Sequence, residues 1–139
     1  MSAAVREALE WVGTPYVHGA SAKGLGCDCL GLIRGVWRGL GREEPEAPPP
    51  YGPDWAEAAG RETLLEACAR HMSPAAGEIA VGQVLLFRMR EAGPAKHLGL
   101  TVSDERFVHA YQGHGVIVSP LSTPWRRRIA AHFVFPQEV

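Results

Sequence analysis

The stretch Asp28-Cys29-Leu30-Gly31-Leu32-Ile33-Arg34-Gly35-Val36-Trp37 decides the fold of this chain. Its apolar side chains recur at positions i, i+3, i+4 and i+7, which predicts an amphipathic helix with one buried face. Asp28 is a suitable N-cap, so the helix is expected to begin at Cys29. A thiol at this end of a helix lies in the positive field of the helix dipole, which favours the thiolate. Cys29 is therefore a candidate nucleophile.

The sequence also predicts a helix on each side of this one. Residues 5–12 carry apolar side chains at helical spacing, and Gly13-Thr14-Pro15 is expected to end that helix. A proline-rich connector is predicted over 44–53, because proline at this density is incompatible with a helix or an interior strand. A further helix is predicted over 54–72, interrupted or kinked near Gly60.

The periodicity changes after Gly77 to short apolar runs that are typical of strands. Five strands are expected, at residues 84–87, 97–102, 106–111, 116–119 and 129–135. Helices followed by strands predict an α+β fold in which N-terminal helices pack on a C-terminal antiparallel β-sheet. The length of 139 residues suits a single domain over 1–139.

Gly31, Gly35 and Gly39 lie four residues apart on the predicted central helix. Each costs about 1 kcal/mol relative to alanine inside a helix. Such a stripe favours close packing against another backbone, and the alternative is a weak exposed face.

Composition narrows the function classes. A formal net charge of −1 gives no reason to expect a nucleic-acid partner. No apolar run reaches the roughly 20 residues of a membrane span, and the charges within Met1–Trp11 argue against a secretory signal. Three cysteines suggest no disulfide framework, so synthesis in a reducing compartment is expected. The cluster Arg126-Arg127-Arg128 is either a solvated turn or docking surface, or a site for an anionic polymer.

Two histidines on predicted strands, His97 and His109, could supply a general base and a residue that orients it. If residues 103–105 form a three-residue hairpin loop, the residues that flank the loop pair with each other. Gly99 then lies opposite His109, and His97 is the diagonal neighbour of His109 on the same face. A four-residue loop would place the two imidazoles on opposite faces. With Cys29, this pattern favours a cysteine peptidase whose base and thiol form an imidazolium–thiolate pair near neutral pH.

Metal binding is the competing chemistry for these side chains. The residues that could include zinc ligands are Cys27, Cys29, Cys68, His71, His97, His109 and His114. However, the spacing of Cys27 and Cys29 is not that of zinc knuckles, and no second cysteine pair follows. We therefore expect neither a metal nor another cofactor.

Four motifs resemble the NlpC-type family of papain-like cell-wall peptidases: Gly13–Tyr16 (GTPY), Cys27–Leu32 (CDCLGL), Lys96–Leu100 (KHLGL) and Phe107–Ala110 (FVHA). The resemblance implies a papain-like fold and a substrate in the peptide stems of peptidoglycan, typically cut between D-γ-glutamyl and a diamino acid. It also implies that Cys29 attacks the carbonyl, that His97 is base and then acid, and that His109 orients His97.

The same resemblance implies a substrate-binding and oxyanion set beside the thiol. Tyr16 would hold the substrate or the developing oxyanion, and Asp28 would lie in the same set. The backbone N–H of Cys29 is a further oxyanion donor, because it lies at a helix start. The family commonly has serine after the nucleophile, where this chain has Leu30.

A narrower resemblance is to cell-wall peptidases encoded with the tail genes of phages and gene transfer agents. It is carried by residues 20–24, 48–51 and 124–129. It implies an enzyme made in the cytoplasm without a signal peptide and carried at the tail tip of a virion or phage-like particle. Its partners would be tail or baseplate proteins, and it would act in the target cell wall. The alternatives are a tail structural component with weak or no activity, and an amidase or acyltransferase on the same fold.

Overall fold

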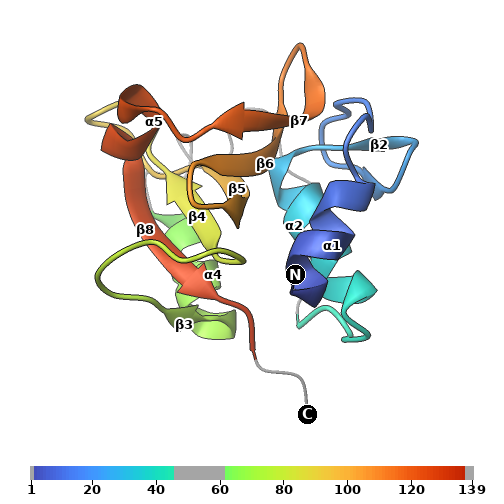
Figure 1. The fold of residues 1–139 in the computed structure, drawn as a ribbon, viewed down its shortest axis with the longest axis horizontal. Helices are drawn as coiled ribbons and strands as arrows, with labels where there is room; N and C mark the ends of the chain where they lie inside the picture. Colours follow the sequence, from blue (N-terminus) through green and yellow to red (C-terminus); the bar gives the residue numbers. More distant parts are fainter. Residues whose placement is uncertain (1, 46–61, 137–139) are drawn as a thin grey trace.

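The computed structural model describes residues 2–45 and 62–136 (Figure 1). Its helices are α1 (Ala3–Glu10), α2 (Cys29–Gly39), α4 (Thr63–His71) and α5 (Thr123–Arg127). Its strands are β1 (Ser21–Ala22), β2 (Gly26–Cys27), β3 (Ser73–Pro74), β4 (Val84–Phe87), β5 (His97–Ser103), β6 (Arg106–Tyr111), β7 (Gly115–Pro120) and β8 (Ile129–Val134). Among these residues, no helix has the length and apolar character needed to cross a bilayer.

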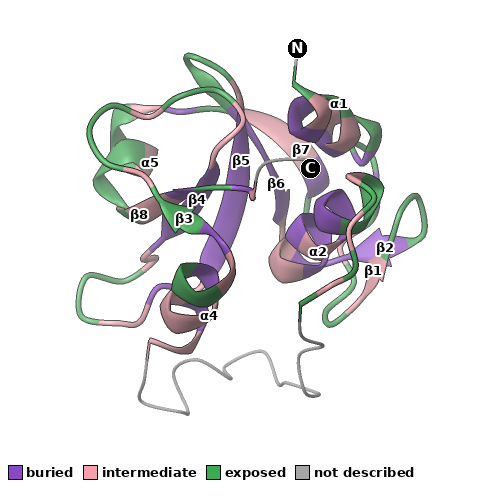
Figure 2. Cartoon of the chain, turned by 90° about the horizontal axis from the view of Figure 1, so that it is seen from below, coloured by how far each residue is buried: buried purple, intermediate pink, exposed green. Residues whose placement is uncertain are grey.

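The strands form one six-stranded antiparallel sheet and one small hairpin. The sheet order is β3-β8-β4-β5-β6-β7, and β1 pairs with β2. Helices α1 and α2 pack on one face of the sheet, and Figure 2 shows the buried strand β5 at its centre. Layers of helix and antiparallel sheet confirm the predicted α+β class.

The alternating side chains of the strands build two separate apolar cores. The core on the helix side includes Val5, Leu32, Val36, Leu86, Leu98, Val108 and Phe133. The smaller core on the opposite face contains Leu85, Phe87, Phe107 and Leu121, with Trp125 of α5 packed against it. The helices therefore cover one face, while the short α5 covers part of the other.

The three glycines of α2 differ in what lies close to them. A Cβ on Gly31 would lie 1.8 Å from the carbonyl oxygen of Ala20, which is backbone. A Cβ on Gly35 would lie 2.0 Å from the ring of Trp11, and a Cβ on Gly39 would lie 2.3 Å from the side chain of Glu7. The predicted packing against another backbone is thus confirmed at Gly31 alone. Gly35 packs closely against a side chain, and Gly39 is exposed and meets only the end of a side chain.

The turn between β5 and β6 differs from the expected three-residue loop. Ser103 pairs with Arg106, so only two residues separate the strands. The register shifts between Thr101 and Ser103, and further along the ladder Leu100 pairs with Val108. This is the register that the expected loop would have given, because the irregularity offsets the shorter turn. The expected loop is wrong, but the two histidines share a face as inferred.

The five predicted strands are all found. Strands β4 and β6 have the predicted bounds, whereas β5, β7 and β8 differ by one residue at one or both ends. Helix α4 lies within the predicted 54–72 helix, but the interruption near Gly60 and most of the 44–53 connector lie outside the described residues. The short elements β1, β2, β3 and α5 were not predicted, since two to five residues carry too little periodicity.

Candidate active site

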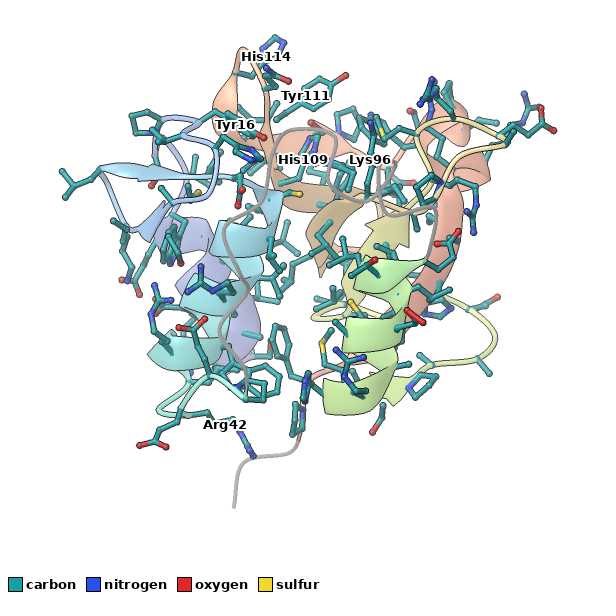
Figure 3. All side chains as sticks on the ribbon, turned by 180° about the vertical axis from the view of Figure 1, so that it is seen from behind. Tyr16, Arg42, Lys96, His109, Tyr111 and His114 are labelled. Atoms are coloured by element: carbon teal, nitrogen blue, oxygen red, sulfur yellow. The ribbon has the colours of Figure 1, made fainter. Side chains whose placement is uncertain are left out.

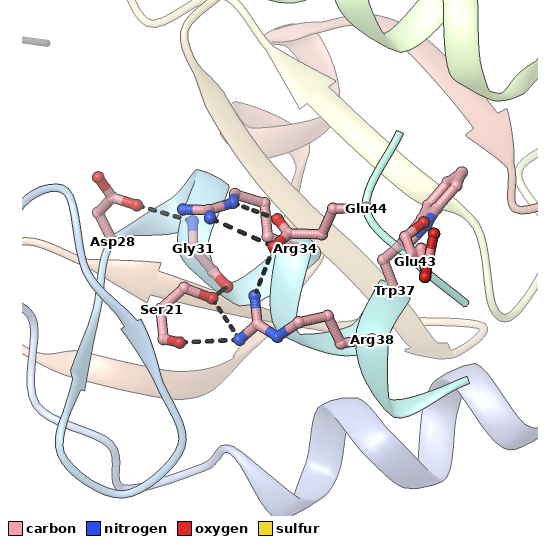
Figure 4. A network of polar contacts seen from close by, with 8 residues as sticks. All are labelled: Ser21, Asp28, Gly31, Arg34, Trp37, Arg38, Glu43 and Glu44. Carbon is pink, nitrogen blue, oxygen red and sulfur yellow. Dashed lines mark hydrogen bonds and ion pairs between the residues drawn. The ribbon is translucent and has the colours of Figure 1, made fainter. Parts of the chain in front are cut away.

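Helix α2 begins at Cys29 because Asp28 caps it. The Oδ1 atom of Asp28 accepts a hydrogen bond from the N–H of Gly31 at 2.7 Å, as Figure 4 shows. Its Oδ2 atom accepts from the N–H of Gly19, also at 2.7 Å. Asp28 is only 3% exposed, so this carboxylate holds the helix start and the preceding loop together. The sequence-derived N-cap is confirmed, and the substrate-binding role of Asp28 stays a prediction.

A second set of contacts fastens the β1–β2 hairpin to α2 (Figure 4). The hydroxyl of Ser21 donates to the carbonyl of Gly31 at 2.6 Å. Arg38 donates to the carbonyl of Ser21 at 2.8 Å and forms an ion pair with Glu44 at 3.3 Å. Since the same helix carries Cys29 at its first position, these contacts fix where the thiol lies.

The thiol of Cys29 packs against the backbone at the start of β5. Its Sγ donates to the carbonyl of Lys96 at 3.6 Å. Burial and the nearby Asp28 carboxylate raise the pKa of Cys29 to about 12, against the smaller opposing effect of the N–H groups of Leu98, Leu30 and Cys29. Cys29 is only partly buried by surface area, and these N–H donors are already directed at its sulfur.

The two histidines expected to meet do so directly. The Nε2 atom of His97 lies 2.7 Å from the Nδ1 atom of His109, at hydrogen-bond distance. Both side chains are buried, and burial lowers the pKa of His97 to about 3 and that of His109 to about 4. Because Nε2 of His97 is engaged, Nδ1 is the ring nitrogen left to accept a proton from a thiol.

These pKa values alter the expected ionisation of the site. A pair in which the thiol of Cys29 has a pKa of about 12 and His97 a pKa of about 3 is neutral at neutral pH. Burial penalises the charged forms of both groups and so works against the expected thiolate–imidazolium pair, which stays a prediction.

Aromatic rings enclose the histidine pair on the face opposite α2. The ring of Trp125, on α5, lies 5.7 Å from that of His97 and 5.2 Å from that of His109. Phe107 contacts His109 at 4.4 Å. Arg126 and Arg128 from the basic cluster support this arrangement: Arg126 donates to a carbonyl at 3.0 Å, and Arg128 lies 5.7 Å from the Trp125 ring. The rings keep water from the imidazoles and so keep them neutral.

Tyr16 lies beside the thiol and borders an open pocket. Burial, followed by the proximity of Cys29 and Asp28, raises the pKa of Tyr16 to about 12, so its phenol remains a hydrogen-bond donor. The pocket has a volume of about 490 Å³ and is lined by residues 13–16 and 112–115. Figure 3 shows Tyr16 and His109 at the same end of the molecule, together with His114. A substrate in this pocket would be adjacent to the proposed nucleophile.

An apolar pocket of about 160 Å³ lies between α2 and α4. Leu30 and Leu98 line it next to Cys29, and Trp37 lies further along the same wall. The residue that follows the thiol therefore presents an alkyl group where a serine would present a hydroxyl.

Two residues of the site were not identified from the sequence as part of it. The hydroxyl of Ser119 lies 2.8 Å from Nε2 of His109, and Trp125 covers both imidazoles. Strand parity could have found Ser119: His109 pairs with Ile117, so Ser119 points to the same face two residues on. No comparable signal exists for Trp125, which is brought to the sheet by a five-residue helix.

The described parts of the chain contain no cluster of side chains suited to hold a metal ion. Over residues 2–45 and 62–136, no group of three or more histidine, cysteine or acidic side chains is placed to hold a metal ion. Cys27 and Cys68 are buried in the helix-side core, as small apolar residues would be.

The buried neutral histidines predict that acid destabilises the fold. An unfolded histidine has a pKa of about 6.5, whereas His97 and His109 stay neutral in the folded chain down to about 3 and about 4. The unfolded chain therefore binds more protons below about pH 6.5, and the free energy of unfolding should fall from about pH 7 to about pH 4. Urea denaturation at a series of pH values in this range measures the unfolding free energy. In the His109→Gln variant, this free energy should depend less steeply on pH. An unfolding free energy that is constant over this range, or an unchanged slope in the variant, would contradict the assignment.

A cysteine at the start of a buried helix, beside an antiparallel sheet with two hydrogen-bonded histidines, is the arrangement of papain-like cysteine peptidases. A family model described as the NlpC/P60 family matches residues 13–134, and the chain belongs to this family. The family and the fold expected from the sequence are thereby confirmed.

Curated relatives are similar over most of this chain. The "Murein DD-endopeptidase MepS/Murein LD-carboxypeptidase" of Escherichia coli (strain K12) is 28% identical over 121 residues, covering 86% of this chain and 54% of the relative. A "Probable endopeptidase" of Haemophilus influenzae is 26% identical over 117 residues, covering 84% and 62%. The chain thus spans between half and two thirds of the length of these relatives.

Solved structures share the fold. A protein from Staphylococcus aureus described as "similar to lipoprotein, NLP/P60 family" matches with a TM-score of 0.67 and 21% identity, covering 98% of this chain and 41% of that one. The NlpC/p60 domain of the peptidoglycan hydrolase SagA matches with a TM-score of 0.64 and 24% identity, covering 96% and 97%. The second match extends over nearly the whole of both chains, so one such domain has the dimensions of this chain.

Proposed function

We propose that this protein is a cysteine endopeptidase that cleaves the stem peptides of peptidoglycan. The observation that carries the proposal is the 2.7 Å contact between His97 and His109 next to the helix that begins with Cys29. The relatives named as murein or peptidoglycan hydrolases support the choice of substrate. An amidase or acyltransferase would use the same thiol, so the bond that is cut separates these functions.

In the proposed reaction, Sγ of Cys29 forms a bond to the carbonyl carbon of the scissile peptide, and its proton moves to Nδ1 of His97. His97 then donates this proton to the leaving amine as the C–N bond breaks, which leaves a thioester on Cys29. A water molecule gives a proton to His97 and attacks the thioester, and that proton returns to the sulfur when the acid product leaves. His109 holds His97 through the Nε2–Nδ1 contact.

The developing oxyanion needs donors that are in place before the reaction. Two candidates lie at the thiol. The N–H of Cys29 is at the free N-terminal end of α2, and Tyr16 keeps its phenolic proton because its pKa is raised to about 12. A neutral donor does not compete with His97 for the proton of the thiol.

Two bonds are candidates for cleavage. The family resemblance favours the bond between D-γ-glutamyl and a diamino acid, whereas the E. coli relative is named as a DD-endopeptidase. Leu30 borders an apolar pocket at the position where the family commonly has serine. This departure bears on the pocket and does not choose between the two bonds. On the family resemblance, we propose the D-γ-glutamyl bond as the one that is cut.

We further propose that a phage-like tail carries the enzyme to the cell wall, with tail or baseplate proteins as its partners. The support is the sequence resemblance of residues 20–24, 48–51 and 124–129 to tail-associated peptidases. The first of these lies at the β1–β2 hairpin, and the last includes most of α5. A tail structural component with weak or no activity is the alternative.

Digestion of purified peptidoglycan tests the proposal. The protein is incubated with peptidoglycan and with a defined muropeptide, and new products are identified by mass spectrometry. Fragments that end in D-γ-glutamate would support the proposed bond, and fragments cut at a D,D-bond would replace it with the bond named for the relative. Release of the intact stem peptide from the sugar would identify an amidase. No product from any substrate would refute the peptidase and favour the structural role.

A further inference from the structure

The histidine pair is hydrogen-bonded to a third side chain, that of Ser119. His109 uses both ring nitrogens: Nδ1 lies 2.7 Å from His97, and Nε2 lies 2.8 Å from the hydroxyl oxygen of Ser119. Ser119 is on β7, next to β6, in the register that pairs it with Phe107. The two contacts therefore form a continuous line of hydrogen bonds across neighbouring strands.

Proton counting limits how this line can be arranged. Each contact holds one hydrogen, so in the neutral state the donors can run from His97 towards Ser119 or in the opposite direction. In the first arrangement, Nε2–H of His97 donates to His109, and Nδ1 of His97 is free to accept. In the reverse arrangement, Nδ1 of His97 carries the hydrogen and cannot take a proton from a thiol.

The charged form of His97 allows only the first arrangement. An imidazolium donates from both nitrogens, so Nδ1 of His109 must accept. The remaining hydrogen of His109 is then on Nε2, and it needs an acceptor because His109 is fully buried. The rings around His109 are those of Phe107, Tyr111 and Trp125, so the Ser119 oxygen is the acceptor found at Nε2.

We propose that Ser119 is a positioning residue that accepts a hydrogen bond from Nε2–H of His109 and thereby fixes the tautomers of both histidines. This inference rests on the proposed function, in which His97 takes the proton of Cys29. Ser119 is partly exposed, so its own hydroxyl hydrogen can turn to solvent while the oxygen accepts. The Ser119 hydroxyl matters most when His97 is charged during the reaction. Its loss should therefore reduce kcat more than it changes KM.

Two variants of equal shape isolate the hydroxyl. Ser119→Thr keeps the oxygen and Ser119→Val lacks it, while both add β-branched side chains that suit a strand. We expect Ser119→Val to lower kcat for stem-peptide hydrolysis roughly 10-fold or more, with Ser119→Thr close to wild type. Ser122→Ala is the matched control: Ser122 precedes α5 without a side-chain cap hydrogen bond, and its loss should leave kcat unchanged. Equal kcat values for the valine and threonine variants would overturn the assignment.

Nitrogen-15 NMR of the histidine rings tests the same inference without catalysis. In the wild-type protein His109 should carry its hydrogen on Nε2, and in Ser119→Val this preference should be lost. A wild-type His109 with its hydrogen on Nδ1 would overturn the assignment even in an active enzyme. An inactive wild-type protein would refute the proposed function, and the ring tautomer would still decide the role of Ser119.

Discussion

Replacing Cys29 with alanine should reduce the hydrolysis of peptidoglycan stem peptides roughly 10⁴-fold or more, since no other group in the proposed reaction forms the covalent intermediate. The fold should be retained. Cys29 is the first residue of α2, and the N-cap contacts of Asp28 with Gly31 and Gly19 do not involve its side chain. Product formation is followed by mass spectrometry, and folding is followed by urea denaturation.

Cys68 provides the matched control for this substitution. It is also a free cysteine, but it is buried on α4, where burial alone raises its pKa to about 12. Cys68→Ala should lose about 1 kcal/mol of stability through the cavity it leaves and keep its hydrolytic rate. Full activity in Cys29→Ala would refute the mechanism. A Cys68→Ala variant that folds but loses activity would show that the assay does not report on Cys29.

The sequence predicted the central features of the fold and the site because each depends on a short-range pattern. The cap at Asp28 and the spacing on α2 place Cys29, and strand alternation places His97 and His109 on one face. The conclusion about the histidines was correct although the expected turn was not. An irregularity near Thr101 offsets the shorter turn, and such irregularities have no reliable signature in a single sequence.

The ionisation of the site could not be predicted in the same way. The helix start and a nearby base both favour a thiolate, and both were visible in the sequence. Desolvation works against them, and at the histidines it comes in part from the rings of Trp125 and Phe107, on α5 and β6. Because tertiary packing brings these rings together, the lowered pKa values of the imidazoles could be inferred only once the fold was known.

Burial of the thiol and the imidazoles also has a consequence for the proposed reaction. A free enzyme with a neutral pair has a weak nucleophile, so substrate binding must supply what favours charge separation. In the proposed reaction, a carbonyl oxygen placed against the N–H of Cys29 and the phenol of Tyr16 would develop negative charge as the proton reaches His97. The histidine line that ends at Ser119 would then stabilise the positive charge on His97. Charge separation and bond formation would thus occur together.

Replacing Gly31 with alanine should have the largest effect on stability. The added Cβ would lie 1.8 Å from the carbonyl oxygen of Ala20 and 3.1 Å from Oδ1 of Asp28. The first neighbour is backbone in a segment that the Ser21–Gly31 contact also holds to α2, so relief requires the hairpin to move away. We expect a loss of about 3 kcal/mol or more, even though alanine is better than glycine in a helix by about 1 kcal/mol.

Gly39→Ala on the same helix separates this clash from the change in helix propensity. Its Cβ would meet the end of the flexible Glu7 side chain, 2.3 Å away, which can rotate aside at the cost of its contacts with Lys23 and with the indole N–H of Trp11. The gain in propensity should offset this cost, so its stability should stay within about 1 kcal/mol of wild type. Urea denaturation of both variants measures the difference, and Gly31→Ala should also lose hydrolytic activity, because the helix start that carries Cys29 must shift with the hairpin. A Gly31→Ala variant as stable as Gly39→Ala would show that the loop before α2 does not position the thiol.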